Sequence, residues 1–194
     1  MNQHPTHIGT NDKILIIFDL DETLVHTTKE SLARKEDFMI GEYYGYKRPF
    51  LEFLLMNLSP YFSLAIWSSG TELYVISVIE KITPDRIKFE FIWSRGKCTH
   101  RFDPDYNDYY YAKKLEKVEK LGFTKNRILI IEDIPKNVTL NYGNAVLIKP
   151  YTGSDDNELE ILCNYLISIK DAQNIRAIDK RRWKTKFQVT NPQS

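Results

Sequence analysis

The hydrophobic residues of this chain form short apolar runs that alternate with segments of helical periodicity. The runs are rich in β-branched and aromatic residues, which is typical of strands buried on both faces. They cover residues 14–18, 61–67, 89–93, 127–131 and 145–148. Helices are expected at residues 49–58, 71–82, 111–121 and 155–169. This alternation predicts an α/β fold in which helices cover both faces of a parallel sheet.

Local signals refine these elements. Pro49 stands at a first-turn position, and Gly122 follows the third expected helix, where glycine commonly ends a helix. Residues 25–46 do not follow the alternation of strand-like and helix-like segments, because they mix charged residues with glycines and tyrosines. They predict a hairpin or small flap beside the first strand. The helix at 71–82 follows Ser69-Gly70 and carries apolar residues at Leu73, Ile76, Ile79 and Ile82.

The composition is that of an ordinary globular protein of 194 residues, with 42% hydrophobic and 27% charged residues. The net charge of +1 gives no reason to expect direct binding to nucleic acid or to a membrane. Only two cysteines are present, and we find neither a secretory leader nor an apolar run of about 20 residues. We therefore expect a soluble, intracellular protein, cytoplasmic or nuclear, that is monomeric.

Three segments are expected along the chain: a flexible N-terminus at 1–11, one folded domain at 12–170, and a C-terminal helix or basic tail at 171–194. The last segment contains the run Lys180-Arg181-Arg182-Trp183-Lys184. A terminal basic cluster is usually solvated, and a docking site for an acidic partner is the alternative.

Chemistry-bearing residues follow the first strand, at Asp19, Asp21 and Thr23. Ligands of open α/β sheets gather at the carboxyl ends of the strands. An ionised carboxylate attacks phosphorus without a base, and a second carboxyl protonates the leaving alcohol and then activates water. Two acids this close repel, and Mg²⁺, which prefers oxygen ligands and binds phosphate, would stabilise them. Alternatively, both aspartates are only turn or cap residues.

Two further strand ends carry polar groups. Ser68, Ser69 and Gly70 precede a helix, where hydroxyls and free N–H groups favour an anion, although a plain helix cap is the alternative. Glu132 and Asp133 end an apolar strand, which is costly without a nearby cation. They predict a second contribution to a metal site, with simple solvation in a turn as the alternative.

The site also needs positive charge. Arg95 follows the strand at 89–93 and suits phosphate or carboxylate recognition. A phosphoester beside several carboxylates needs a fixed cation besides the metal. Lys113 and Lys114 are the candidates, and their positions alone do not distinguish them.

Taken in their order along the chain, these motifs resemble those of the haloacid dehalogenase (HAD) superfamily of phosphatases. Within it, the chain is similar to the branch that holds the small phosphatases of the RNA polymerase II C-terminal domain, the NLI-interacting-factor-like branch. The matching segments, which lie between residues 14 and 169, are Asp19-Leu20-Asp21-Glu22-Thr23-Leu24-Val25-His26, Lys47-Arg48-Pro49, Arg95-Gly96-Lys97-Cys98 and Glu132-Asp133-Ile134-Pro135.

The resemblance implies a HAD-like (Rossmann-like) three-layer fold at 12–170, with a central parallel sheet, a small flap or hairpin insertion and no large cap domain. It implies that Asp19 is the nucleophile and Asp21 the general acid and base. Mg²⁺ would be held by the carboxylates of Asp19 and Asp133 and by the backbone carbonyl of Asp21. The remaining site residues would be Thr23, Ser68, Ser69 and Lys113 for phosphate and Arg95 for the substrate.

The implied activity is hydrolysis of phosphoserine or phosphothreonine in a protein or peptide through an aspartyl-phosphate. A sugar phosphate or nucleotide substrate is one alternative, and a non-catalytic peptide-binding module of the same fold is another. The chain departs from the branch in two places. Ser68-Ser69-Gly70 replaces a usual Thr-Ala-Ser, and Glu132, which could alter the outer shell of the metal, stands where Asp is usual.

Overall fold

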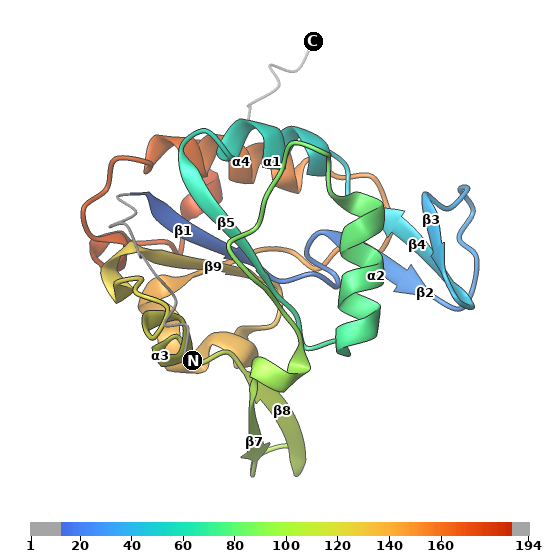
Figure 1. Cartoon of the computed structure of the whole chain (residues 1–194), viewed down its shortest axis with the longest axis horizontal. Coiled ribbons are helices and arrows are strands. Elements are labelled where there is room, and N and C mark those ends of the chain that lie inside the picture. The colour runs from blue at the N-terminus through green and yellow to red at the C-terminus, as the bar shows by residue number, and fades with distance from the viewer. Residues whose placement is uncertain (1–12, 188–194) are drawn as a thin grey trace, which may run out of the picture.

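A five-stranded parallel sheet forms the centre of the computed structural model, which describes residues 13–187 (Figure 1). Its strand order is β10-β9-β1-β5-β6, so β1 lies in the middle, between β9 and β5. The strands are β1 (Ile14–Phe18), β5 (Phe62–Trp67), β6 (Ile92–Trp93), β9 (Ile128–Glu132) and β10 (Ala145–Leu147). The predicted α/β fold with a parallel sheet is confirmed. The N-terminal segment expected at 1–11 lies outside the described residues.

Helices cover both faces of this sheet, which gives the expected three layers (Figure 1). Ile14, Ile16 and Phe18 of β1 face one apolar cluster, whereas Leu15 and Ile17 face the other, as the alternation of side chains along a strand requires. The first cluster includes residues of α1 (Leu51–Leu58), α2 (Glu72–Ile82) and α4 (Glu158–Ser168). The second includes residues of α3 (Glu116–Glu119) and of the 3-10 helix η3 (Pro135–Asn144).

The segment expected as a flap is a three-stranded antiparallel sheet of order β2-β4-β3, which projects from the body (Figure 1). Its strands are β2 (Val25–Thr28), β3 (Phe38–Ile40) and β4 (Tyr43–Lys47). Gly45 allows β3 and β4 to pack tightly, because a Cβ at this position would lie 2.1 Å from the ring of Phe38. Residues 13–187 contain no large cap domain, and none of their helices is long and apolar enough to cross a membrane.

The prediction of a helix at 111–121 is wrong for residues 111 and 112, which belong to a strand. Residues 99–112 instead form a projecting antiparallel hairpin of β7 (Thr99–Asp103) and β8 (Asp108–Ala112), and α3 is only one turn (Figure 1). Aromatic residues favour strands, and here each pairs with a residue across the hairpin. The turn of helix that remains ends before Gly122, as predicted, and this glycine has a φ of 95°.

Of the four apolar residues noted in the sequence of α2, only Ile79 and Ile82 are buried. Leu73 and Ile76 are 79% and 44% exposed, whereas Val75 and Val78 are buried together with Ile79. A repeat of three residues drifts around a helix of 3.6 residues per turn, so positions 73 and 79 cannot share a face. The buried positions follow the i, i+3, i+4, i+7 pattern instead.

The two remaining differences lie at the edges of the sheet. β6 is shorter than the predicted strand at 89–93, although Glu90 and Phe91 still bond to the backbone of β5. Residues 171–187 contain two short 3-10 helices, η4 (Ile175–Ala177) and η5 (Trp183–Lys186). Trp183 is buried, and its Nε1 donates a hydrogen bond to the carbonyl oxygen of Leu147 at 2.9 Å.

Candidate active site

The candidate residues come together at the carboxyl ends of three adjacent strands. Asp19 follows β1, Ser68 follows β5, and Glu132 ends β9. Lys113 enters from the side, directly after β8. Because parallel strands end at one edge of the sheet, segments that are far apart in the sequence meet there.

An acidic cluster forms the centre of this site. Asp19, Glu132 and Asp133 each offer a carboxylate oxygen, and these three oxygens lie within 4.8 Å of one another. Within residues 13–187, Lys113 is the one ammonium group that pairs with the cluster, and it can balance one of the three carboxylate charges. A set of oxygen ligands with excess negative charge fits a hard divalent cation such as Mg²⁺.

Lys113 lies fully buried against two of these acids. Its Nζ is 2.5 Å from Asp19 Oδ1 and 2.5 Å from Glu132 Oε2. Burial acts against the ammonium charge, but the two carboxylates outweigh it and raise the pKa of Lys113. Lys114 is exposed and pairs with Glu116 on the surface. The structure therefore places Lys113, and not its neighbour, beside the acids.

Glu132 has both carboxylate oxygens occupied. Its Oε2 accepts from Lys113, and its Oε1 accepts from Asn137 Nδ2 at 3.1 Å and from the Ile134 N–H at 3.3 Å. These contacts fix Glu132 as the residue that orients Lys113. No local pattern marks Asn137, because its position depends on the path of η3.

The carboxyl group of Asp21 lies apart from the acidic cluster and has its own partners. Tyr74 OH donates to Oδ1, and Ser68 Oγ donates to Oδ2 at 3.3 Å. The Tyr74 hydroxyl also lies 2.9 Å from Thr27 Oγ1 in the flap. Burial raises the pKa of Asp21, while the hydrogen bonds from Tyr74 and Ser68 act to lower it. Sequence analysis missed Tyr74, because nothing in the pattern of α2 marks it.

The pKa values of Asp133 and Asp19 are both raised. Burial, followed by the charge of Glu132, raises the pKa of Asp133 to about 7. The same two causes raise the pKa of Asp19 above its usual value. Thr23, which is buried, donates to Asp133 Oδ1 at 3.4 Å. A bound divalent cation would favour the ionised form of both acids.

The Ser68-Ser69-Gly70 segment shows why glycine stands at its third position. The Gly70 N–H donates to Ser68 Oγ at 2.9 Å. A Cβ on Gly70 would lie 2.9 Å from the ring of Tyr74, so a larger residue would displace the side chain that contacts Asp21. The carbonyl of Ser69 accepts a bond from Arg95 Nε at 2.7 Å, which fixes the exposed Arg95 at the rim of the site.

A second buried cation, Arg48, supports the loop that follows β1. Its guanidinium binds both carboxylate oxygens of Asp156 and donates to the carbonyl oxygens of Thr23 at 3.1 Å and Lys149 at 2.9 Å. Arg48 thereby ties Thr23 to the start of α4. The Lys47-Arg48-Pro49 motif pointed to Arg48 without indicating what it binds.

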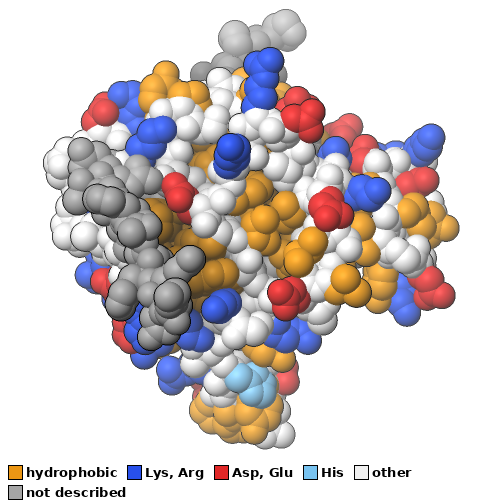
Figure 2. All heavy atoms as spheres, in the orientation of Figure 1, with side chains coloured by type: hydrophobic (Ala, Val, Ile, Leu, Met, Phe, Trp, Pro, Cys, Tyr) orange, Lys and Arg blue, Asp and Glu red, His pale blue; other side chains and the backbone are white. Residues whose placement is uncertain are grey.

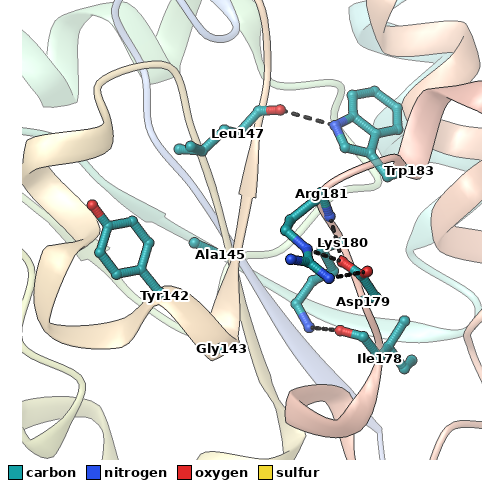
Figure 3. A pocket seen from close by; sticks show the side chains of 9 residues that line it. All are labelled: Tyr142, Gly143, Ala145, Leu147, Ile178, Asp179, Lys180, Arg181 and Trp183. Atoms are coloured by element: carbon teal, nitrogen blue, oxygen red, sulfur yellow. Dashed lines mark hydrogen bonds and ion pairs between the residues drawn. The ribbon is translucent and has the colours of Figure 1, made fainter.

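One cavity lies away from this site. It has a volume of about 610 Å³ and lies beside the edge strand β10 (Figure 3). Its lining contains none of the acids, and a bidentate ion pair between Asp179 and Arg181 lies along one wall (Figure 3). The candidate catalytic residues therefore lie elsewhere.

The fold and the site together define a HAD-like protein of a phosphatase family. Residues 14–176 match the NLI interacting factor-like phosphatase family, and the chain belongs to that family. This match confirms the resemblance found in the sequence.

Similar proteins align with most of the length of this chain. It is 28% identical over 180 residues to CTD small phosphatase-like protein 2 of Dictyostelium discoideum. This alignment covers 89% of this chain and 30% of that protein. The chain is 25% identical to the CTD nuclear envelope phosphatase 1 homolog of Drosophila melanogaster, covering 86% of this chain and 71% of that protein. The chain thus spans less than a third of the first relative.

Two further similarities bear on the fold and on the alternatives. The fission yeast RNA polymerase II CTD phosphatase Fcp1, bound to beryllium fluoride, superimposes with a TM-score of 0.55 at 18% identity, over 84% of this chain and 52% of that one. This similarity shows the fold alone. Mitochondrial import inner membrane translocase subunit TIM50 of Eremothecium gossypii is 32% identical over 114 residues, or 58% of this chain and 22% of that protein.

Proposed function

We propose that this protein is a Mg²⁺-dependent phosphomonoesterase that removes phosphate from phosphoserine or phosphothreonine in a polypeptide. One observation carries the proposal: Asp19 lies against Lys113 and within the acidic cluster, whereas the carboxyl group of Asp21 is held outside that cluster. Two aspartates two residues apart therefore have different surroundings, as a nucleophile and a general acid require.

The reaction proceeds in two steps. The Asp19 carboxylate forms a bond to phosphorus while the bond from phosphorus to the ester oxygen breaks, and Asp21 gives its proton to the departing oxygen. Asp21 then takes a proton from the water that attacks the aspartyl-phosphate, which releases inorganic phosphate and restores Asp19. Asp19, Asp133 and the backbone carbonyl of Asp21 would hold Mg²⁺, which would supply positive charge that stabilises the phosphoryl group.

The other side chains bind and orient the phosphoryl group. Lys113 is the fixed cation beside the nucleophile, and Glu132 holds it there. Ser68, which follows β5, and Thr23, which lies in the loop after β1, are buried hydroxyl donors. Ser69 completes the phosphate-binding loop. The raised pKa of Asp21 supports its assignment as an acid, because burial stabilises the protonated form.

The names of the relatives support a polypeptide substrate, since those relatives are called CTD and nuclear envelope phosphatases. A small metabolite remains the alternative substrate. The similarity to an import translocase subunit favours a second candidate, a non-catalytic peptide-binding module. Against that candidate stand the two aspartates, the buried lysine and Asp133, all of which this chain retains.

The decisive experiment replaces the nucleophile. Asp19→Asn should abolish release of phosphate from a small aryl phosphate, while the circular dichroism spectrum and melting temperature show that the fold is retained. Asp21→Asn should slow hydrolysis of the intermediate, so that mass spectrometry detects a phosphoryl adduct on Asp19. Turnover by Asp19→Asn at the wild-type rate would exclude the covalent mechanism.

A substrate comparison separates the candidates. Phosphopeptides and phosphorylated metabolites are offered in parallel, with Mg²⁺ and with EDTA. The proposed enzyme should prefer the peptides and lose activity in EDTA. A metabolite phosphatase should prefer the second set, and a non-catalytic module should release phosphate from neither.

A further inference from the structure

One face of the β7–β8 hairpin carries a continuous row of rings, here called the aromatic ladder: His100, Phe102, Tyr109 and Tyr111. His100 is paired with Tyr111 across the hairpin, and Phe102 with Tyr109. The ring centroid of His100 lies 5.2 Å from that of Tyr111 and 4.6 Å from that of Tyr109. The ring centroids of Phe102 and Tyr109 are 5.1 Å apart. These spacings are those of stacked aromatic pairs.

The aromatic ladder begins at the candidate active site. The guanidinium carbon of Arg95 lies 5.0 Å from the ring centroid of Tyr111, and Arg95 Nε donates to the carbonyl of Ser69. Lys113 follows Tyr111 by two residues along the chain. The rings therefore run without interruption from the rim of the phosphate site outward along the projecting hairpin.

The ladder face is open to solvent. Phe102 and Tyr109 are 48% and 59% exposed, and His100 is exposed as well. Apolar side chains and a histidine gather on the projection at the bottom of Figure 2, where Figure 1 labels β7 and β8. This surface adjoins the site through the contact between Tyr111 and Arg95.

The opposite face of the hairpin anchors it to the body. Lys136 of η3 forms an ion pair with Asp103 at 2.5 Å, and its Nζ lies 4.0 Å from the ring centroid of Tyr106. Aromatic pairs across a hairpin also stabilise the hairpin itself, which is the purely structural explanation of the ladder. That explanation does not require the rings to remain half exposed or to continue as far as Arg95.

We infer that the aromatic ladder binds the residues that flank the phosphorylated residue of an extended polypeptide substrate, an inference that rests on the proposed function. Open aromatic rows bind extended segments that contain proline or aromatic residues. A strand advances about 3.3 Å per residue, so Tyr111 and Tyr109 lie about 7 Å and about 13 Å along the chain from Lys113. A substrate side chain two to four positions from the phosphoserine spans this range of distances, and a small metabolite does not.

The test compares matched phosphoserine peptides in a polar background: one without an aromatic residue, one with tyrosine three positions before the phosphoserine and one with tyrosine three positions after it. One of the tyrosine peptides should be cleaved with a kcat/KM about tenfold higher than the polar peptide, mainly through KM. The double variant Phe102→Ser with Tyr109→Ser should lose this preference, and Tyr109→Phe should keep it.

Two controls separate the ladder from general effects. The double variant should turn over a small aryl phosphate at the wild-type rate, because that substrate does not reach the hairpin. Tyr142→Ser removes a tyrosine that is as exposed as Tyr109, at 59%, but lies beside the remote cavity at β10 (Figure 3). This variant should keep the preference for the tyrosine peptide.

The outcomes distinguish this inference from the proposed function. Turnover of the aryl phosphate with equal kcat/KM for all three peptides, or a preference that survives the double substitution, overturns the inference and leaves the phosphatase intact. If the wild type releases phosphate from no substrate, the proposed function fails. Fluorescence anisotropy with the same peptides then decides: tighter binding of a tyrosine peptide that the double variant loses supports the ladder, and equal binding overturns it.

Discussion

Among the residues that the structure describes, two of the buried cations, Lys113 and Arg48, have opposite surroundings. Arg48 is paired with one carboxylate, that of Asp156, and its other donors bind two backbone carbonyls. Lys113 faces two carboxylates, and a third, Asp133, lies beside them. The network of Arg48 is balanced, whereas that of Lys113 has excess negative charge. A balanced buried network stabilises a loop, and an unbalanced one indicates a site that a cation completes.

The largest expected effect comes from removing the cation of the unbalanced network. Lys113→Met should reduce turnover of a small aryl phosphate by at least about 100-fold, because the nucleophile loses the charge that binds the phosphoryl oxygens. The matched control is Lys114→Met, which removes the neighbouring, exposed lysine and should leave the rate unchanged. Steady-state kinetics on both variants check the prediction, and equal losses in the two would contradict it.

Stability sharpens the same comparison. With EDTA present, Lys113→Met should lower the free energy of unfolding by about 3 kcal/mol, because buried carboxylates lose their partner. Adding Glu132→Gln should recover part of this loss without restoring turnover, since one of the unpaired charges is removed. Urea unfolding measures both quantities. A double variant that is no more stable than the single one would argue against the pairing of Lys113 with Glu132.

In the balanced network, the effect should fall on stability rather than on chemistry. Arg48→Met should lower the free energy of unfolding by about 3 kcal/mol, because Asp156 and two backbone carbonyls lose their donors. Turnover per folded molecule should change far less than in Lys113→Met. Parallel unfolding and kinetic measurements test this, and a large loss of turnover in a fully folded variant would place Arg48 in the catalytic machinery.

Metal addition should separate the two networks directly. Mg²⁺ at about 100 times its dissociation constant should stabilise the wild type by about 2.7 kcal/mol, seen as a rise in melting temperature. Asp133→Asn should lose this rise, and Asp156→Asn, which removes an acid of the other network, should keep it. A rise that persists in Asp133→Asn would show that the cation binds elsewhere.

The smallest effect concerns the hydroxyl group that contacts Asp21. Tyr74→Phe removes a hydrogen bond to the proposed general acid, which should reduce kcat by about tenfold with little change in melting temperature. Tyr142→Phe is the control, because it removes the hydroxyl of an exposed tyrosine at the distant cavity. An unchanged kcat in Tyr74→Phe would show that the orientation of Asp21 does not depend on this bond.

Local pattern predicted most of the sheet and failed at the hairpin. The runs that form β1, β5 and β9 consist of residues that are buried on both faces of the sheet. Their apolar, β-branched composition is therefore enough to predict that they are strands. The tyrosines at 109–111 are followed by a charged segment with helical spacing, and only pairing with residues 99–103 decides that they form a strand. The Pro, Asp and Asn residues at 103–108 are a local signal for the hairpin turn, which the interpretation of 111–121 as a helix overlooked.

The sequence by itself determined the parallel α/β fold, the motif at Asp19 and Asp21, and the acids at the end of β9, because the positions of buried strands and the alternation of strands with helices follow from short-range patterns. Tertiary structure alone decided that Lys113 rather than Lys114 faces the acids, that Glu132 orients it, and that Tyr74 contacts Asp21. These outcomes depend on the direction in which a side chain leaves its element and on what lies opposite, and both are fixed only when distant segments pack together.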